Sequence, residues 1–479
     1  MEVWERFKRF KGKKIALYGL GTETLKFISQ TEDFFYIVGL LDGFRTAGEM
    51  YGKRIIDFKS CIELGVEAVI VVARPGSCKA IAGKIAGLCR KNGIELFDVR
   101  GKNLLKAERD YFTYDRLLEY MSKEINMYDI RAQLFINRLN EMTDKSDKAD
   151  KSYSGRKGNL CKEAPLCIND SYDIGYLFCA PIITDFVLWM KDYVRDSGIQ
   201  NVLMCARDGY LIDKLYRKIT SEEASTYFYT SRTAAIRAGV SDREDIAYVD
   251  SMKFGGSLEK NIYERFGIRI NCSGLDNDFD KAVHFQEKIL RRAEKLKGGY
   301  EKYVSTIPLK EGDTALFDFV SKGTTQYYLE RIIPNKLTGL YFLQLEPDFM
   351  KDKKLDIVSF YKEEELEASA IYEDYYILET ILTSSEPSVL EISEKGVPVF
   401  GKETRNEDMI RCSERIRRGI EDYFLQYIEA VGNGYTIDKH TDEVFLKLIH
   451  NLEIVSQEFL EMVVEDPFFN RNTGIKDIL

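Results

Sequence analysis

The sequence predicts an α/β protein with two mainly parallel sheets, followed by a mainly helical C-terminal region. Short apolar runs alternate with segments of helical periodicity through residues 1–105 and again through 173–350, and this alternation is typical of βαβ units. Residues 351–479 instead hold long helical patterns. A chain of 479 residues is long enough for two or three domains, and its content of 44% hydrophobic and 31% charged residues is that of a globular protein.

The first predicted domain covers residues 1–105. Its expected strands are KKIALY, FYIVGLLD, EAVIVVA and IELFDV, with helical patterns between them. The turn after the first strand keeps two glycines of the dinucleotide-binding fingerprint, Gly19 and Gly21, but has Thr24 in place of the third. Asp42 ends the next strand at a suitable distance to accept a hydrogen bond from a ribose hydroxyl.

These features predict a site for a nucleotide-type cofactor, formed by Gly19, Gly21, Thr22 and Asp42. The alternative is a glycine turn that only lets the strand and the helix pack closely. The phrases KKIALYGLGTET, IVGLLD, YGKRIIDF and EAVIVVARP resemble the small Rossmann-like domains attached to sugar-modifying proteins of bacterial glycan pathways. That resemblance implies a nucleotide-type ligand, such as an NAD-type cofactor or a sugar nucleotide, in some members and a structural accessory in others.

Residues 106–172 are predicted to connect the two sheets. Helical periodicity continues to about residue 140, and residues 141–170 are polar and rich in Ser, Lys and Asp. Such a segment has too little apolar surface to offset the entropy of ordering, so a flexible linker is expected there. Cys161 and Cys167 match no common redox or metal spacing, and two solvated thiols are the favoured interpretation.

The second predicted α/β domain covers residues 173–350. Residues 176–195 indicate a buried helix, a long insertion is expected over about 233–310, and strands are expected at NVLMCA, TYFYTSR, the run before Asp318, and TGLYFLQLE. The ligand crevice of an open parallel sheet lies at the carboxyl ends of its strands, so polar side chains at these ends are expected to converge. Three strands end in such residues: Arg207 and Asp208, Ser231 and Arg232, and Asp318 and Ser321.

Arginine suits this crevice because its planar guanidinium donates two parallel hydrogen bonds to a phosphate. The alternatives are a local ion pair for Arg207–Asp208 and a solvated strand end for Arg232. After Asp318, small and hydroxylated residues occupy a strand-to-helix junction, where backbone N–H groups can surround a phosphate. Asp318 is expected to hold sugar hydroxyls or a metal ion, and the expected phosphate-binding residues are Ser321, Lys322, Gly323, Thr324 and Thr325.

The order of strand, ARDG, helix, strand, long insertion, strand, DFVSKGTT and helix resembles the type I phosphoribosyltransferases. The resemblance implies that Arg207 and Gly209 contact pyrophosphate. It also implies that the loop from Ser321 to Thr325 binds the sugar 5-phosphate, with Lys322 standing where that family commonly has a hydroxyl residue.

Two acidic residues usually precede the phosphate loop in that family. Asp318 matches the second of them, and Phe317 stands at the first. Asp208 stands where a second glycine is common in the pyrophosphate loop, and its charge could replace the missing acid. Asp318 and Asp208 are therefore the expected catalytic residues of a transferase, with Mg²⁺ accompanying the phosphorylated ligand.

The phrases LMCARDGYLIDKLY, YFYTSRTAA, ALFDFVSKGTTQ and YYILETILTSSEPSVL extend a second resemblance over residues 173–470, to an uncharacterised region found in bacterial surface-polysaccharide gene clusters. There the region often follows a haloacid-dehalogenase-like phosphatase module, and such proteins are labelled predicted hydrolases. That module needs two aspartates spaced DxD at a strand end, typically within an FDxFDT phrase. This chain lacks the phrase, and its nearest segment, MYDIRAQLF, has no second acid. A phosphatase is therefore the least favoured function.

The composition excludes several classes of function. The net charge of −9 and the isoelectric point near 5.3 argue against general nucleic-acid binding. The nine cysteines form no CxxC pair, which fits reduced thiols in the cytoplasm, and the three histidines show no metal-ligand spacing. No apolar run is expected to approach the length of a membrane span.

The expected function is that of a protein of bacterial surface-polysaccharide biosynthesis, a glycosyl- or phosphoribosyl-type transferase that binds a phosphorylated sugar or nucleotide. The alternative is a non-catalytic nucleotide-sensing or scaffold protein with a glycosyltransferase partner. In both interpretations residues 351–479 form a mainly helical cover on the second sheet.

Overall fold

The computed structural model describes residues 3–105, 111–150, 164–252, 254–271, 282–363, 369–466, 468 and 471–479. The chain divides into two compact units. The first comprises Met1–Asp110, Tyr372–Asp374 and Thr473–Leu479, and the second comprises Tyr111–Ile371 and Tyr375–Asn472. Each unit contains a parallel sheet flanked by helices, so the expected α/β class is confirmed.

The first unit is built on a four-stranded parallel sheet in the order β2-β1-β5-β6. β1 contributes Ile15 and Leu17 to one buried core and Ala16 to the other, because successive side chains of a strand point to opposite faces. Both faces are therefore covered, as in βαβ folds. The elements of this unit are η1 (Val3–Phe10), β1 (Lys14–Tyr18), α1 (Thr22–Thr31), β2 (Tyr36–Leu41), β3 (Glu49–Met50), β4 (Lys53–Arg54), α2 (Phe58–Glu63), β5 (Ala68–Val71), α3 (Pro75–Asn92) and β6 (Glu95–Asp98).

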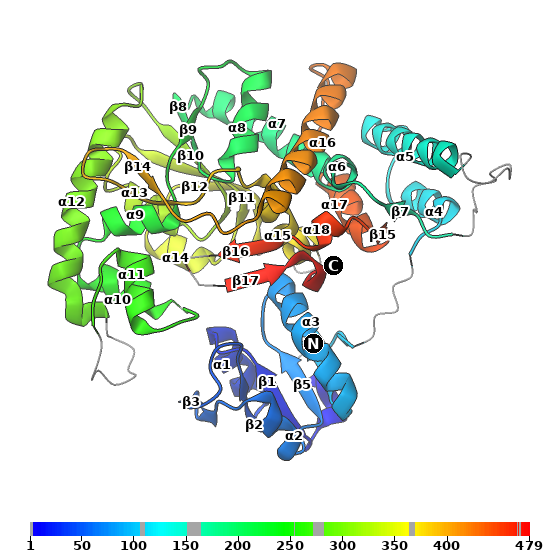
Figure 1. Ribbon diagram of the computed structural model, residues 1–479, viewed down its shortest axis with the longest axis vertical. Helices are drawn as coiled ribbons and strands as arrows, with labels where there is room; N and C mark the ends of the chain where they lie inside the picture. Colours follow the sequence, from blue (N-terminus) through cyan, green and yellow to red (C-terminus); the bar gives the residue numbers. More distant parts are fainter. Residues whose placement is uncertain are drawn as a thin grey trace. The chain divides into compact units, whose positions relative to one another are not determined.

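The second unit contains a five-stranded sheet, parallel throughout, in the order β12-β11-β10-β8-β9. Figure 1 labels these five strands. The chain begins this sheet at β8, places β9 on one side and then returns to place β10 on the other side. The strand order therefore reverses between β8 and β10, and such a reversal opens a crevice at the carboxyl ends of the two strands. The strands are β8 (Asn201–Cys205), β9 (Thr226–Phe228), β10 (Thr314–Ser321), β11 (Leu337–Gln344) and β12 (Ile357–Lys362).

One face of this sheet packs on α7 (Ala180–Ser197) through aromatic rings. The ring of Phe186 lies 5.7 Å from that of Phe317 in β10, 5.4 Å from Phe342 in β11 and 5.7 Å from Phe360 in β12. A single helix residue therefore contacts three neighbouring strands.

The opposite face packs on helices from the connection between β9 and β10. This connection contains the expected long insertion, and its buried residues share a core with Leu316 of β10. Asp318 follows Leu316 by two positions, so the alternation of the strand directs it to this same face. The helices after β8 are α8 (Gly209–Ile219), α9 (Arg232–Gly239), α10 (Arg243–Ser251), α11 (Leu258–Phe266) and α12 (Gln286–Ser305), and α13 (Thr324–Leu329) follows β10.

The buried helix predicted over residues 176–195 is confirmed. It is part of a continuous helical segment, Ser171–Ser197, whose length and composition match those of a membrane span, contrary to the expectation that no apolar run approaches that length. In the fold, 94% of its most apolar window is buried, as in a core helix. Gly175 allows α16 (Glu407–Val431) to approach, because a Cβ there would lie 2.1 Å from the Ile416 carbonyl oxygen.

The connection between the sheets is more helical than predicted. Helices α4 (Tyr114–Glu124) and α5 (Ile130–Asp150) occupy it, and α5 extends into the segment expected to be flexible because EMTDKSDKAD contains no Gly or Pro to end a helix. Residues 151–163, including Cys161, lie outside the described residues. Cys167 is exposed in β7 (Cys167–Ile168), which pairs in parallel with β15 (Glu453–Ile454).

The C-terminal region is mainly helical, with a short antiparallel hairpin of β13 and β14. A polar loop, residues 383–388, joins α15 to this hairpin. Further elements are α14 (Pro347–Asp352), α15 (Ala370–Leu382), β13 (Val389–Ile392), β14 (Pro398–Phe400), α17 (Lys439–Lys447), α18 (Gln457–Leu460), β16 (Val463–Asp466) and β17 (Arg471–Gly474).

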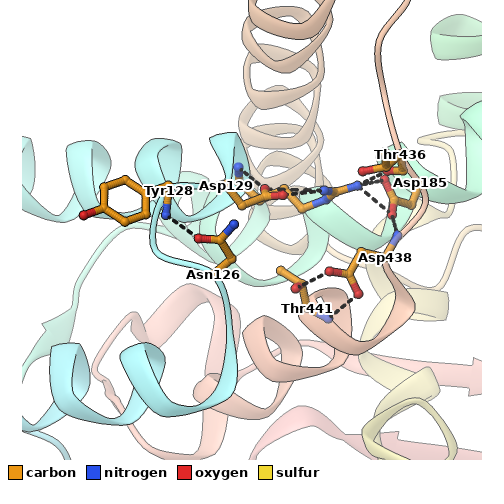
Figure 2. A network of polar contacts seen from close by, with 8 residues as sticks. Asn126, Tyr128, Asp129, Asp185, Thr436, Asp438 and Thr441 are labelled. Carbon is orange, nitrogen blue, oxygen red and sulfur yellow. Dashed lines mark hydrogen bonds and ion pairs between the residues drawn. The ribbon is translucent and has the colours of Figure 1, made fainter.

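A buried ionic network joins distant segments of the second unit (Figure 2). Arg131 of α5 is 1% exposed and donates hydrogen bonds of 2.9 and 3.0 Å to the two carboxylate oxygens of Asp185 in α7. Arg131 also pairs with Asp129 at 3.2 Å. The backbone N–H of Asp438 donates to Asp185 Oδ2 at 2.7 Å, so the segment before α17 is fixed to the same carboxylate.

Candidate functional site

A cavity of about 180 Å³ lies at the carboxyl edge of the five-stranded sheet, around the reversal between β8 and β10. Residues that follow β8 and β9 line it together with residues of β10, so the expected convergence of strand ends is present in the structure. Its charged lining residues are Arg207, Asp208, Arg232, Glu264, Asp318, Glu379 and Arg405.

The turn after β8 supplies Arg207 and Asp208. The Ala206–Arg207 peptide bond is cis, and α8 begins at Gly209 directly after the turn. A Cβ on Gly209 would lie 2.9 Å from the carbonyl carbon of Met204, so a glycine is needed for the close packing of α8 on β8. Gly209 is buried and is absent from the cavity lining.

The segment after β9 supplies Thr230, Ser231 and Arg232. The strand was predicted to continue to Arg232, but it ends at Phe228 and Arg232 is the first residue of α9. The reason is local: the Ser231 hydroxyl accepts a hydrogen bond from the backbone N–H of Ala234, which caps the helix. Arg232 therefore reaches the cavity from a helix start.

Asp318 lies within β10, which continues to Ser321 because it pairs with β11 up to Gln344. Phe317, at the position where the phosphoribosyltransferase pair has its first acid, is fully buried on the opposite face. Burial raises the pKa of Asp318, although a hydrogen bond from Ser321 and the charge of Arg232 both favour the ionised form.

Asp208 is the second carboxylate of the cavity. Burial raises its pKa to about 6; the charge of Arg207 opposes this rise, and the charge of Asp318 adds to it. The Thr383 hydroxyl lies 3.3 Å from Asp208 Oδ1 and lowers the pKa, as does Arg232. The charges of the two aspartates thus interact, and both groups have a raised pKa.

The predicted phosphate loop is only partly at the cavity. Thr325 lines it, whereas Ser321, Lys322, Gly323 and Thr324 are absent from the lining. The Lys322 ammonium pairs with Glu346 at 2.7 Å, and the backbone N–H of Gly323 donates to Ser321 Oγ at 3.1 Å. These contacts are internal to the protein.

Part of the cavity wall was not identified from the sequence. The loop after α15 supplies Thr383, and β16 with its neighbours supplies Met462, Val463, Val464 and Phe468. These segments are remote in sequence from β8, β9 and β10. The polar segment TSSEPS, residues 383–388, follows an apolar helix directly, and this is the local pattern that indicates the loop.

The cavity offers two carboxylates that could contact a cation, Asp208 and Asp318. Among the described residues, no group of three or more His, Cys, Asp or Glu side chains could hold a metal ion. Mg²⁺ commonly binds through one or two carboxylates together with substrate phosphates. The two carboxylates present therefore fit a Mg²⁺ ion that arrives with a phosphorylated ligand.

The predicted cofactor residues of the first unit surround the turn after β1. Gly19 has φ +140°, and a Cβ there would lie 2.5 Å from the Val72 carbonyl oxygen, so close packing alone requires a glycine. Gly21 precedes Thr22, the first residue of α1. Asp42 Oδ1 accepts hydrogen bonds from the backbone N–H groups of Phe44 and Arg45, at 3.0 and 3.1 Å.

A hollow of about 280 Å³ in the first unit lies elsewhere, at the amino ends of its strands, and includes Lys13, Glu67 and Glu95. None of the four predicted cofactor residues lines this hollow. The structure thus brings Arg207, Asp208, Arg232, Asp318 and Thr325 together in the second unit.

Comparison with known proteins adds no relative: no protein-family model matches this chain, and no curated protein matches it.

Proposed function

We propose that the second unit binds a phosphorylated sugar or nucleotide in the cavity at the carboxyl edge of its sheet and transfers a group from it. The observation that carries the proposal is the convergence of two arginines and two aspartates on one cavity, from β10 and from the segments that follow β8 and β9. Two guanidinium groups suit a phosphate or diphosphate, and carboxylates suit sugar hydroxyls or a metal ion that accompanies the phosphates.

In this proposal Arg207 and Arg232 neutralise the phosphate groups, and Asp318 accepts hydrogen bonds from sugar hydroxyls. Asp208, with its pKa of about 6, accepts the proton of the attacking group. Loss of a phosphate-type leaving group gives the sugar carbon positive character, so the two carboxylates also favour the transition state by their charge.

Residues 173–470 resemble a region encoded in surface-polysaccharide gene clusters. On this basis we propose that the activity serves glycan assembly in the cytoplasm of a bacterium. The first unit would then bind an NAD-type cofactor or a sugar nucleotide at the turn after β1. The reversal of strand order between β1 and β5 supports a ligand at that edge.

A second candidate is a non-catalytic binding protein of a glycan-assembly complex that works with a glycosyltransferase partner. The observation in its favour is that Phe317 and Lys322 are turned to internal contacts, with Phe317 in the aromatic core and Lys322 paired with Glu346. Such a protein would bind the phosphorylated ligand without releasing a product.

Calorimetric titration with phosphoribosyl diphosphate and with a nucleoside-diphosphate sugar, each with Mg²⁺, tests the proposal. Arg207→Gln and Asp318→Asn each remove about 1.5–3 kcal/mol of charge-assisted hydrogen bonding, so we expect the Kd to rise roughly 10- to 100-fold. The matched controls Arg411→Gln and Asp352→Asn change side chains that are 68% and 72% exposed, and they should bind as the wild type does.

Equal binding by the two cavity variants and the wild type, or absence of binding by the wild type to both ligands, contradicts the proposal. Chromatography of the same mixtures separates the two candidates. A transferase releases pyrophosphate or a nucleoside diphosphate when an acceptor is present, whereas a binding protein leaves the ligand intact.

A further inference from the structure

The loop from Thr383 to Glu386 contacts both residues of the Arg207–Asp208 turn. The Thr383 hydroxyl lies 3.3 Å from Asp208 Oδ1, and the backbone N–H of Ser384 donates to the Arg207 carbonyl oxygen, also at 3.3 Å. One contact reaches the carboxylate and the other reaches the main chain beside it. The loop is therefore placed to fix the direction in which Asp208 points.

Two arginines hold this loop by its carbonyl groups. Arg417 of α16, which is 4% exposed, donates to the Thr383 carbonyl oxygen at 2.5 Å. Arg405 donates to the carbonyl oxygens of Ser384 and Glu386 at 2.7 and 3.0 Å. Charge-assisted hydrogen bonds from planar guanidinium groups are directional, so they fix three carbonyl groups of a short loop.

The Thr383 hydroxyl has two acceptors for one proton. It lies 2.9 Å from the Glu379 carbonyl oxygen, one helical turn earlier, and 3.3 Å from Asp208 Oδ1. A hydroxyl donates one hydrogen bond at a time. An ionised Asp208 attracts the hydroxyl proton more strongly than a neutral carbonyl does; when Asp208 is protonated, the hydroxyl donates to the Glu379 carbonyl oxygen instead.

We propose that Thr383 is a positioning residue for the reaction, held by Arg405 and Arg417, which orients the Asp208 carboxylate and donates a hydrogen bond to its ionised form. The inference rests on the function proposed above, because Asp208 is the group assigned there to proton transfer. Without Thr383 the carboxylate keeps its proton to a higher pH, and fewer molecules can accept the proton of the attacking group at neutral pH.

The test follows the titration of Asp208 in the ligand-free, full-length protein by the ¹³C signal of its carboxyl carbon, assigned with Asp208→Asn. Thr383→Val keeps the side-chain shape and removes the hydroxyl, so the midpoint should rise by about one pH unit relative to the wild type. The other groups that act on Asp208 stay in place: Arg207 in the same turn, Asp318 in β10, Arg232 in α9, Cys205 in β8 and Tyr227 in β9.

Thr380→Val is the matched control. Thr380 lies in α15, one turn before Thr383, and donates to the Tyr376 carbonyl oxygen at 2.7 Å, so loss of its hydroxyl should leave the midpoint unchanged. Thr383→Ser restores a hydroxyl and should restore the wild-type midpoint. Thr383→Ala removes the hydroxyl without adding bulk and should shift the midpoint in the same direction as Val.

An unchanged midpoint in Thr383→Val and Thr383→Ala overturns the inference. So does a shift that Thr383→Ser fails to reverse or that Thr380→Val reproduces. The titration needs no ligand, so its failure is distinguishable from failure of the proposed function. If the midpoint shifts but the protein binds no phosphorylated ligand, the contact between Thr383 and Asp208 is supported and the proposed function is contradicted.

Discussion

At the scale of single residues, Gly323 has a structural reason to be glycine. Its φ is +78°, and a Cβ there would lie 2.7 Å from Leu355 Cδ1 and 3.0 Å from Met350 Cγ. The sequence pattern predicted that this glycine contacts a phosphate. The backbone conformation and the packing require it without any ligand, so a bulky substitution here would disturb the fold and would be a poor probe of binding.

Replacement of Gly323 by alanine should lower the free energy of unfolding. A left-handed backbone conformation costs about 1–2 kcal/mol for an alanine, and the close neighbours add to this cost. Gly298→Ala is the control: Gly298 lies in α12, and a Cβ there would meet none of the described residues within 4 Å, so alanine should be neutral or stabilising by up to about 1 kcal/mol. Urea unfolding followed by circular dichroism measures both, and equal stability of the two variants would refute the argument.

At the scale of elements, α7 packs on one face of the five-stranded sheet and contacts three of its strands. Phe186 contacts rings of β10, β11 and β12, and these strands pair only with their immediate neighbours. Because Phe317 belongs to this aromatic layer, Asp318 is left on the face of α9, where Arg232 lies. The packing of one helix thus decides that Asp318 and Val320 are the β10 residues that line the cavity.

Phe186→Ala should be among the most destabilising substitutions in the second unit. Removal of a buried phenylalanine ring costs about 3–5 kcal/mol, from lost burial and from the cavity left behind. Phe186→Leu keeps most of the volume and should cost less. Tyr128→Ala removes a ring that is 93% exposed and should change the unfolding midpoint little. A thermal midpoint of Phe186→Ala within a degree of that of Tyr128→Ala would contradict this account.

At the scale of the whole molecule, local patterns predicted the strands, whereas distant contacts determined the site. The strands at β1, β5, β8 and β10 are short apolar runs, which their own residues indicate. The order of the strands and the approach of Thr383 and Phe468 to the cavity depend on pairings between residues far apart in the chain. The prediction that β9 continues to Arg232 was wrong, because Ser231 caps α9 and the helix begins at Arg232.

The buried ionic network of the second unit also depends on contacts between residues that are far apart in the chain. Asp442 of α17 is fully buried near Asp185, and neither of its carboxyl oxygens accepts a hydrogen bond from the described residues. Burial and the charge of Asp185 raise the pKa of Asp442 well above its ordinary value, which favours the protonated form of Asp442 beside the Asp185–Arg131 pair.

This arrangement should make Asp442→Asn more stable than the wild type at high pH. An unfolded aspartate loses its proton near pH 4, whereas the folded Asp442 retains it, so the wild type loses up to about 1.4 kcal/mol per pH unit from this group as the pH rises from 4 toward the folded pKa. An asparagine cannot ionise and has no such slope. The stability difference between Asp442→Asn and the wild type, from urea unfolding at pH 5 and pH 8, should therefore grow with pH.

Asp185→Asn is the contrasting variant: it leaves Arg131 without its main partner and should cost about 3–5 kcal/mol at both pH values. A constant difference for Asp442→Asn would show that Asp442 is ionised in the folded protein.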